Sequence, residues 1–386
     1  MEITDDLAAW VVLSRTPGIN TQVLERALLM AGGADAQGPP AAGSIAALVR
    51  LSAASLAALG FGAAARRALA EGGGLTPAEI TWLEQPAHRL VRFTDNGYPP
   101  LLRAVTGFPI LLYVAGDAQR LADPQLAIVG SRNPTGAGTD NAFAFAQHLA
   151  LSGLTITSGL AEGIDAAAHR GALAAPGTTL AVLGTGIDLI YPSMHEELAL
   201  QIQERGALVS EFPLGTPGRA ANFPQRNRII AGLSLGTLVI EAARRSGSLI
   251  TARLAGEAGR EVFALPGSIH NPLARGSHQL IREGAWLTEN AADILSELNF
   301  SSLDGDASGA RKQPAATPKS KPTMDKAQKI LLDALGFEPS DPDVLVRRTG
   351  FKPEEVSSMM LILELEGHVR SAHGGRYTRV ARSPKR

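Results

Sequence analysis

Residues 126–134 read LAIVGSRNP, a short apolar run with β-branched residues that ends in glycine, serine and arginine. A helical stretch follows it. Similar runs recur along the middle of the chain, at residues 154–157, 179–183, 207–210, 237–240 and 261–265. Strands that alternate with helices indicate right-handed crossovers and a parallel sheet covered on both faces. The sequence therefore predicts an α/β core.

Other patterns flank this core and divide the chain into four regions. Residues 1–75 are rich in Ala and Leu and broken by glycine turns, which predicts a helical module of the SAM or helix-hairpin-helix kind, or a simple helical bundle. Residues 76–298 form the predicted core. Residues 299–323 hold almost no apolar side chains and predict a flexible linker. Residues 324–386 contain three helical patterns and a hairpin around two glycines, which suggests a winged helix.

Composition excludes several classes of protein. Lys and Arg number 36 against 37 Asp and Glu, for a formal net charge of -1, so a polyanion would have to bind to a local patch. The absence of cysteine excludes disulfides, thiolate metal sites and a cysteine nucleophile. The acidic amino terminus is unlike a secretory signal, and no apolar stretch of about 20 residues is present. We expect a cytoplasmic protein that does not enter a membrane.

Residues 222–232 read NFPQRNRIIAG and combine an aromatic ring, two guanidinium groups and side-chain amides with an abruptly apolar continuation. This is typical of a loop that enters a buried helix. The donors then lie near the amino end of the helix, where the dipole favours anions. Basic groups beside an aromatic platform suit single-stranded nucleic acid. Alternatively, Phe223 is a core residue and the arginines form ion pairs with Glu241 or Asp165.

Each predicted strand of the core is followed by a polar loop that contains glycine or serine. Ligands of parallel α/β sheets bind beyond the carboxyl ends of the strands, so these loops form one continuous rim. Any one of them alone is weak evidence for a ligand, because a tight strand-to-helix turn requires glycine in any parallel sheet. The residues predicted to contact DNA are Gly130, Ser131, Arg132, Ser158, Gly159, Phe223, Gln225, Arg226, Asn227, Arg228, Ser246, Gly247 and Ser248.

Motifs for other chemistry are missing from the sequence. It has no dinucleotide fingerprint, no phosphate-binding Gly-Lys-Ser/Thr loop and no Gly-x-Ser-x-Gly elbow. His169 lies four residues after Asp165, but two isolated ligands do not make a metal site. We expect no cofactor, no metal and no catalysed reaction.

Five motifs occur in one order and together resemble the DprA/Smf family. They are GSR at 130–132, SGLAEGID at 158–165, GTGIDLIYP at 184–192, FPQRNRIIA at 223–231 and SGSLITA at 246–252. The resemblance covers nearly the whole chain, including the terminal winged helix. It implies an extended Rossmann-like core with a parallel sheet, a helical amino-terminal module and a carboxyl-terminal winged helix.

The resemblance implies a non-catalytic homodimer that binds incoming single-stranded DNA and loads the RecA recombinase during natural transformation. Arg132 would hold a phosphate, and the loop from Phe223 to Arg228 would add contacts. Glu162 departs from the family, in which many members carry arginine at this position. The alternative is a nucleotide-processing hydrolase of the phosphoribohydrolase kind, with Arg132 and Glu241 as phosphate clamp and acid. Its Pro-Gly-Gly-x-Gly-Thr loop is not matched, because Pro266-Gly267 is followed by Ser268-Ile269.

The predicted winged helix carries charges of both signs. Basic residues lie on the wing and beyond it, at Arg370, Arg376, Arg379, Arg382, Lys385 and Arg386. The predicted recognition helix instead carries Glu354, Glu355, Glu364 and Glu366, which would repel a phosphate backbone. We expect this region to bind protein in preference to DNA.

Overall fold

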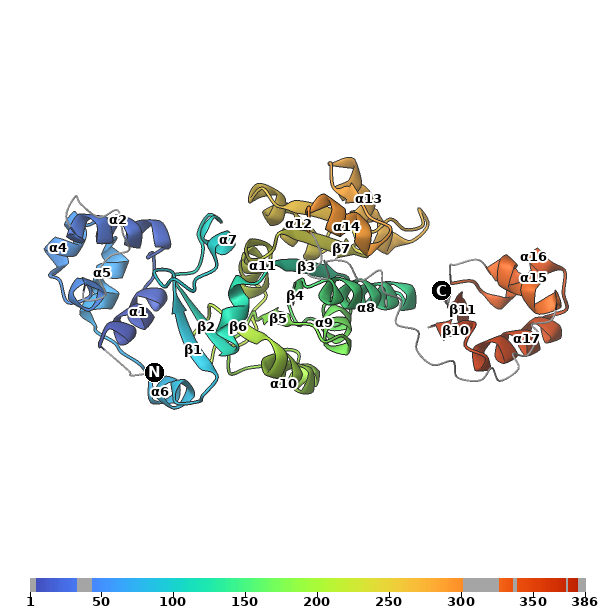
Figure 1. Cartoon of the computed structure of the whole chain (residues 1–386), viewed down its shortest axis with the longest axis horizontal. Helices are drawn as coiled ribbons and strands as arrows, with labels where there is room; N and C mark the ends of the chain where they lie inside the picture. The colour runs from blue at the N-terminus through green and yellow to red at the C-terminus, as the bar shows by residue number, and fades with distance from the viewer. Residues whose placement is uncertain (1–4, 33–43, 301–325, 336–338, 373, 381–386) are drawn as a thin grey trace, which may run out of the picture. The chain divides into compact units, whose positions relative to one another are not determined.

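The computed structural model describes residues 5–32, 44–300, 326–335, 339–372 and 374–380. The chain divides into two compact units (Figure 1). The first comprises residues 1–134 and 138–304, and the second comprises residues 135–137 and 305–386. Most of the predicted linker at 299–323, and the basic residues Arg382, Lys385 and Arg386, lie outside the described residues. In the part of the chain that the structure describes, no helix has the length and apolarity needed to cross a bilayer.

Short helices joined by glycine turns begin the first unit. They are α1 (Asp5–Arg15), α2 (Thr21–Gly32), α3 (Ser44–Leu48), α4 (Ala53–Ala58), α5 (Ala63–Ala70) and α6 (Pro77–Leu83). Gly18 and Gly60 have φ values of 77° and 90°, a left-handed conformation that only glycine adopts without strain, and this ends each helix where the sequence predicts a turn. The predicted break at residues 32–43 lies almost wholly outside the described residues.

A nine-stranded sheet forms the centre of the first unit. Its spatial order is β1-β2-β6-β5-β4-β3-β7-β8-β9. The strands are β1 (His88–Arg92), β2 (Leu111–Gly116), β3 (Gln125–Gly130), β4 (Thr155–Ser158), β5 (Thr179–Val182), β6 (Ala207–Ser210), β7 (Gly236–Ile240), β8 (Glu261–Ala264) and β9 (Trp286–Leu287). The six strands that the sequence predicts are present and parallel, which confirms the α/β fold with a mostly parallel sheet.

Three strands at the edges of the sheet were not predicted. β2 pairs antiparallel with β6, and β1 pairs antiparallel with β2, so this pair extends the sheet beyond the parallel core. A strand added by antiparallel pairing needs no crossover helix, and it therefore lacks the strand-and-helix alternation by which the others were found. β9 is only two residues long and pairs with β8.

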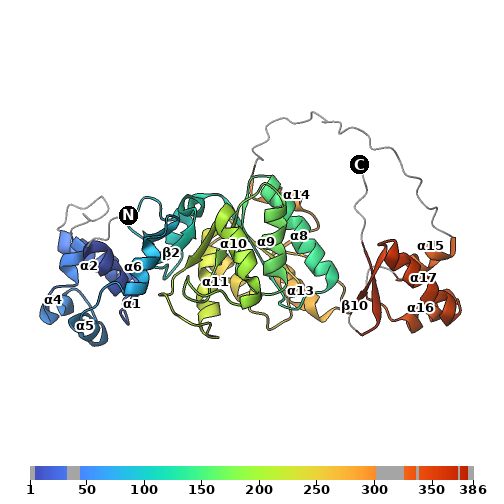
Figure 2. The same cartoon turned by 90° about the horizontal axis from the view of Figure 1, so that it is seen from below.

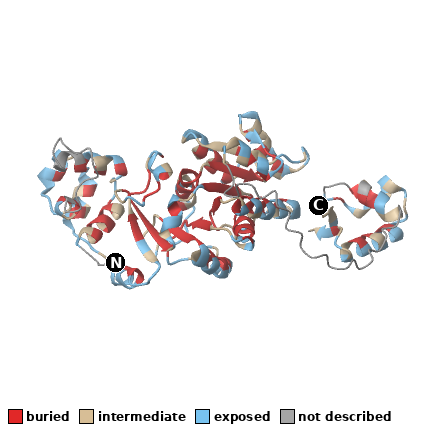
Figure 3. Ribbon diagram, viewed as in Figure 1, coloured by how far each residue is buried: buried red, intermediate tan, exposed pale blue. Residues whose placement is uncertain are grey.

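Helices cover both faces of the sheet. They are α7 (Pro100–Arg103), α8 (Gly136–Leu151), α9 (Ile164–Ala174), α10 (Glu196–Arg205), α11 (Asn222–Leu233), α12 (Ser248–Glu257), α13 (Arg275–Arg282) and α14 (Ala291–Glu297), with 3₁₀ turns η1 (Ala118–Ala122), η2 (Ser193–His195) and η3 (Pro272–Ala274). Figure 2 shows the same helices from a second direction. Buried residues are concentrated in the strands of the sheet and recur along these helices (Figure 3).

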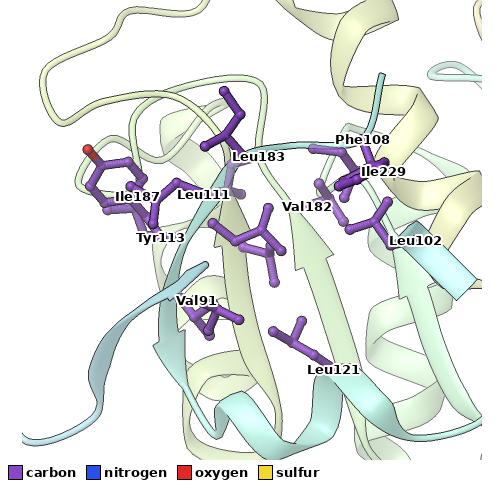
Figure 4. Packing of buried hydrophobic residues seen from close by; sticks show 14 of the residues in the cluster. Val91, Leu102, Phe108, Leu111, Tyr113, Leu121, Val182, Leu183, Ile187 and Ile229 are labelled. Atoms are coloured by element: carbon purple, nitrogen blue, oxygen red, sulfur yellow. The ribbon is translucent and has the colours of Figure 1, made fainter. Parts of the chain in front are cut away.

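The central strand β3 contributes alternate side chains to two cores. Leu126 and Ile128 pack in one cluster with residues of α8, α9 and α14. Ala127 and Val129 belong to the other cluster, which includes residues of α11, α12 and the amino-terminal helices. Figure 4 shows part of this second core, to which Val91, Leu102 and Leu121 contribute together with Val182 of β5 and Ile229 of α11. The β1–β2 extension is therefore packed into the core of the sheet.

The order of the strands creates a crevice beside β3. The chain runs from β3 to β4 on one side, and later returns to β7 on the other side of β3. The helices that follow β3 and β7, α8 and α12, pack in different cores and so lie on opposite faces of the sheet. Their connecting loops diverge at the carboxyl ends of the strands, which is the position where ligands bind in open α/β sheets.

Within its described residues, the second unit contains three helices and a hairpin. These are α15 (Lys326–Leu335), α16 (Pro342–Thr349), α17 (Pro353–Leu365), β10 (Val369–Ala372) and β11 (Arg376–Arg379). The strands pair antiparallel, and Gly374 and Gly375 both have positive φ values, as a tight turn requires. Leu331, Leu345, Val356 and Val369 are among the residues of a separate small core. The elements are those of the predicted winged helix.

Candidate nucleic-acid-binding site

A cavity of about 620 Å³ lies at the carboxyl edge of the sheet, in the crevice beside β3. Its walls come from the loop after β3, the start of α9, the loop before η2, the first turns of α11 and the start of α12. The lining residues are Val129, Gly130, Arg132, Ala161, Asp165, Tyr191, Gly218, Ala220, Phe223, Pro224, Arg226, Asn227, Ile230, Ser246, Gly247, Ser248 and Thr251. Segments distant in sequence therefore meet here, as the rim of loops predicts.

The loop after β3 brings Arg132 to the cavity. A Cβ atom on Gly130 would lie 2.7 Å from Ile164 Cγ1, so only glycine allows this close approach to α9. Ser131 is buried, its hydroxyl oxygen accepts a hydrogen bond from the Asn133 amide at 3.1 Å, and its carbonyl accepts one from Ile164 N at 3.1 Å. Ser131 thus shapes the turn, while Arg132 is exposed.

Arg132 is positioned by an aromatic ring. Its guanidinium carbon lies 5.4 Å from the centroid of Phe223, a cation–π contact. Among the described residues it has no carboxylate partner within ion-pair distance. Its charge-assisted hydrogen bonds therefore remain available to an anion in the cavity.

The sequence predicts a loop that leads into a buried helix, but the helix begins earlier, at Asn222. Phe223 and Pro224 lie in the first turn of α11. The side-chain amide of Asn222 donates to the carbonyls of Gly184 at 3.0 Å and Pro217 at 3.3 Å. A Cβ atom on Gly184 would lie 2.8 Å from Phe223 Cδ1, so glycine makes room for the ring. Phe223 is held against the loop after β5.

Arg226 is buried, with only 4% of its surface exposed. Its guanidinium donates to the carbonyl of Gly159 at 2.7 Å, to the carbonyl of Val182, and through Nε to Asn227 Oδ1 at 3.2 Å. Burial lowers the pKa of Arg226 to about 10, so it is charged at neutral pH. These bonds join α11 to the ends of β4 and β5, and leave Arg226 with fewer donors for DNA than Arg132.

Asp165 is the acidic counterpart of Arg226. Burial raises the pKa of this carboxyl, and the nearby Arg226 charge and the amide donors of Ala161 and Gly159 oppose that shift. One carboxylate oxygen accepts hydrogen bonds from Gly159 N at 3.1 Å and Ala161 N at 3.4 Å. The alternative interpretation of the sequence named an ion pair with Asp165, but the ion pairs of the described residues do not include Arg226, so the two side chains interact only through their charges.

Arg228 and Gln225 lie outside the cavity lining and approach Glu211. Arg228 forms an ion pair with the Glu211 carboxylate, and 17% of the arginine side chain and 10% of the glutamate side chain are exposed. Burial raises the pKa of Glu211, while Arg228 and a hydrogen bond from Gln225 oppose this shift. The two cations of the Arg-Asn-Arg motif therefore both have acidic neighbours in the protein.

The loop after β4 holds neighbouring segments of the site in place. Ser158 is fully buried and its hydroxyl donates to the carbonyl of Ile128 at 2.6 Å. A Cβ atom on Gly159 would lie 2.5 Å from Arg226 Cζ, so glycine is required for the arginine to enter. Leu160 follows with a φ of 58°, a conformation that costs energy for a branched residue. Neither Ser158 nor Gly159 lines the cavity; Glu162 is exposed on the same loop.

The loop before α12 closes the opposite wall. The hydroxyl oxygens of Ser246 and Ser248 lie 2.6 Å apart, and Asn227 Nδ2 donates to the carbonyl of Gly247 at 3.3 Å. Both serines and Gly247 line the cavity. Because one of these hydroxyl groups donates to the other, the remaining hydroxyl proton of the pair is available to an anion held by Arg132.

Further cations adjoin the lining residues in sequence. Arg219 lies between the lining residues Gly218 and Ala220, and Arg244 and Arg245 directly precede Ser246; all three arginines are exposed. The salt bridges of the described residues include none of them. A chain with a net charge of -1 can thus present a locally positive rim.

Some lining residues were absent from the predicted set. Tyr191, Gly218, Ala220, Pro224 and Thr251 all line the cavity. An aromatic residue directly after a glycine-rich loop was the available signal for Tyr191. Nothing in the sequence marks Gly218 or Ala220, because the segment before α11 has no regular pattern and reaches the cavity only through the fold.

Comparison with known proteins matches residues 89–299 to the family of DNA recombination-mediator protein A, and residues 313–375 to the DprA winged helix domain. The chain belongs to the DprA family. It is 46% identical over 312 residues to Protein Smf of Escherichia coli, a match that covers 79% of this chain and 81% of that protein. It is 45% identical over 206 residues to DprA of Streptococcus pneumoniae, covering 53% of this chain and 73% of the relative.

Two solved DprA structures resemble this one. The X-ray structure of DprA from Streptococcus pneumoniae superposes with a TM-score of 0.64 at 34% identity, and the match covers 77% of this chain and 99% of that chain. DprA from Helicobacter pylori, whose structure concerns its mode of binding single-stranded DNA, gives a TM-score of 0.50 at 28% identity and covers 55% of this chain and 95% of that chain. The chain is thus a DNA-processing protein of the recombination-mediator family with a winged helix domain.

Proposed function

We propose that this DprA-family chain binds single-stranded DNA along the carboxyl edge of its sheet and acts as a recombination mediator. The observation that carries the proposal is the exposed guanidinium of Arg132, which lies over Phe223 at the cavity without a carboxylate partner among the described residues. An unpaired cation beside an aromatic ring suits a phosphate next to a base. Ser246, Ser248 and Asn227 add polar groups on the facing wall.

The biological role that we propose is protection of incoming DNA and loading of RecA onto it during natural transformation, in the cytoplasm. Membership of the recombination-mediator family supports this role. A strand-exchange assay in which RecA must displace a single-strand-binding protein tests it. Faster exchange with the chain present is expected, and an unchanged rate would refute the loading role without affecting the DNA site.

We further propose that the chain acts as a homodimer. At the β9 edge of the sheet, Trp286 is 47% exposed and Leu287 is 51% exposed. An apolar edge strand left open to water is a template for pairing with another chain, so a second copy would cover it. Light scattering across a range of concentrations gives the mass that decides between monomer and dimer.

A binding role is favoured over the phosphoribohydrolase alternative by the orientation of Glu241. A Cβ atom on Gly138 would lie 2.5 Å from Glu241 Oε2, and Asn271 Nδ2 donates to Glu241 Oε1 at 3.4 Å. The carboxylate therefore faces the start of α8 and does not line the cavity beside Arg132. It is badly placed to act as an acid on a nucleotide held there.

We predict that oligo-dT binds more tightly than duplex DNA or mononucleotides of the same base. The contacts are to the backbone and to base faces, so base identity should have little effect. The logarithm of the binding constant should fall with the logarithm of salt concentration by roughly 0.7 per phosphate neutralised. Fluorescence anisotropy with labelled oligonucleotides measures both. Preferential binding of duplex DNA, or a strong dependence of affinity on one base sequence, would contradict the placement of the DNA site at the cavity.

We propose that the winged helix binds protein and contributes little to DNA affinity. Helix α17 presents the exposed carboxylates of Glu354 and Glu355 and the exposed side chains of Leu361 and Leu365. The two carboxylates would repel a phosphate backbone, and such a backbone would not cover the two exposed leucine side chains. Two of the acids on α17 also make structural hydrogen bonds: Glu364 accepts one from Ser371 N at 2.9 Å and so positions the hairpin, and Glu355 accepts one from Lys352 N at 3.0 Å at the start of the helix.

A chain that ends after Phe300 should therefore keep most of its affinity for oligo-dT. The cavity lies wholly within the first unit, and Phe300 packs against the core there, so this end point preserves the fold. The full-length chain is the control, and circular dichroism reports folding. If the shortened chain is folded but fails to bind oligo-dT, the main DNA site is in the second unit and the proposed placement of Arg132 and Phe223 is wrong.

A further inference from the structure

Tyr191 is an exposed aromatic residue at the mouth of the cavity. It lies in the loop between β5 and η2, lines the cavity, and has 54% of its surface exposed. Its ring centroid is 5.7 Å from that of Phe223, with an angle of 43° between the ring planes. Tyr191 and Phe223 are the aromatic residues among those lining the cavity.

Other tyrosines of the chain show what a structural tyrosine looks like here. Tyr98 is buried and its hydroxyl donates to the carbonyl of Pro109 at 2.8 Å. Tyr113 is buried and its hydroxyl donates to the Glu79 carboxylate at 3.0 Å. Tyr191 is not buried, and within the described residues its hydroxyl makes no hydrogen bond that would anchor the loop. A role in the stability of the core does not account for it.

Phe223 is less accessible to a base than its position in the motif suggests. The Arg132 guanidinium lies over its ring, and the backbone at Gly184 lies against it. Its ring is only partly exposed. A base that stacked on Phe223 from the side of Arg132 would have to displace the cation, whereas the exposed ring of Tyr191 has no such competitor.

The Tyr191 ring is supported by its neighbours. Phe223 packs beside it, and a Cβ atom on Gly218 would lie 3.4 Å from Tyr191 Cγ, so the loop before α11 also approaches the ring. A supported ring loses little conformational freedom when a ligand stacks on it, which strengthens binding relative to a mobile side chain. The guanidinium of Arg132 is on the same side of the cavity through its contact with Phe223.

We propose that Tyr191 is the base-stacking platform of the site, and that Phe223 mainly positions Arg132 and Tyr191. The ligand group is a nucleobase of a single strand, next to the phosphate that Arg132 holds. This inference rests on the proposed single-strand binding and adds to it a division of labour: Arg132 binds the backbone, and Tyr191 binds a base.

The test compares oligo-dT with an abasic oligonucleotide of the same length, because only the former can stack. In the full-length parent, oligo-dT should bind more tightly than the abasic strand. Tyr191→Leu keeps apolar contact with Phe223 but removes the aromatic face, and it should lower the affinity for oligo-dT roughly tenfold. Its affinity for the abasic strand should not change, and Tyr191→Phe should bind both strands like the parent.

Met194→Ala is the matched control, since Met194 lies three residues further along, is 71% exposed and does not line the cavity. It should bind both strands like the parent. Equal loss of affinity for both strands in Tyr191→Leu, or no loss for either, would overturn the role of Tyr191. Failure of the parent to bind either strand would instead refute the proposed function. Thermal melts of each variant separate these outcomes from unfolding.

Discussion

Replacement of Arg226 with alanine is expected to lower the free energy of unfolding by about 3–5 kcal/mol, because it leaves the buried carboxylate of Asp165 without its counter-charge. Burial already raises the pKa of Asp165, and Arg226 is the main opposing influence. The carbonyls of Gly159 and Val182 would also lose their donor. Arg226→Lys should recover only part of the loss, since Nη1 donates to both carbonyls while Nε donates to Asn227 Oδ1, and a single ammonium cannot replace both nitrogens.

Urea unfolding followed by circular dichroism measures this change. Arg219→Ala is the control: Arg219 is an exposed arginine of the same segment and is absent from the ion pairs of the described residues, so its loss should change stability by less than about 0.5 kcal/mol. If Arg226→Ala is as stable as the parent but binds oligo-dT poorly, then Arg226 is a direct phosphate ligand and its hydrogen bonds between α11 and the strands contribute little to stability.

Replacement of Arg132 with alanine should weaken binding of single-stranded DNA by about 1.5–3 kcal/mol, roughly ten- to a hundredfold in Kd, because it removes a charge-assisted contact from a partly enclosed site. The free energy of unfolding should be unaffected, since the Arg132 side chain is exposed and contacts only the half-buried ring of Phe223. The salt dependence of binding should also become shallower, because one fewer phosphate is neutralised.

Arg253→Ala provides the comparison for Arg132. The Arg253 side chain is 68% exposed on α12, pairs with Glu257 and does not line the cavity. Its removal therefore changes the net charge by the same amount as Arg132→Ala, but it leaves the cavity unchanged. Anisotropy measurements at two salt concentrations should find weaker binding of single-stranded DNA in Arg132→Ala alone. Equal effects in the two would mean that the overall charge, and not a phosphate site at Arg132, determines affinity.

The sequence predicted the six parallel strands well because each contains a short apolar run followed by a polar loop. Five of them are almost wholly buried and carry no charge, and only β8 begins with a half-buried charged residue, Glu261. The antiparallel extension made by β1 and β2 was missed. β1 reads HRLVR, and its charged residues conceal the strand, which is recognisable only from its pairing with β2.

The candidate site was predicted as a rim of loops, and the structure brings most of the predicted residues to one cavity. Ser131, Ser158, Gly159, Gln225 and Arg228 are exceptions and do not line it. Their polar groups are occupied by the protein: Ser158 by the Ile128 carbonyl, and Arg228 by Glu211. Such partners come from other strands, and no local pattern indicates which polar side chain will meet them.

The class of fold, the order of the loops along the rim and the family could all be predicted from the sequence, because periodicity, glycine turns and motifs are local properties of the chain. The role of each arginine could not, because it depends on the packing of the sheet. Arg226 donates to carbonyls at the ends of β4 and β5, Arg228 pairs with Glu211 after β6, and Arg132 contacts only a ring. A helix turns by about 100° per residue, so cations two positions apart point in different directions. Whether a cation binds DNA or a carboxylate then depends on which strand end lies opposite, and only the packed sheet fixes that.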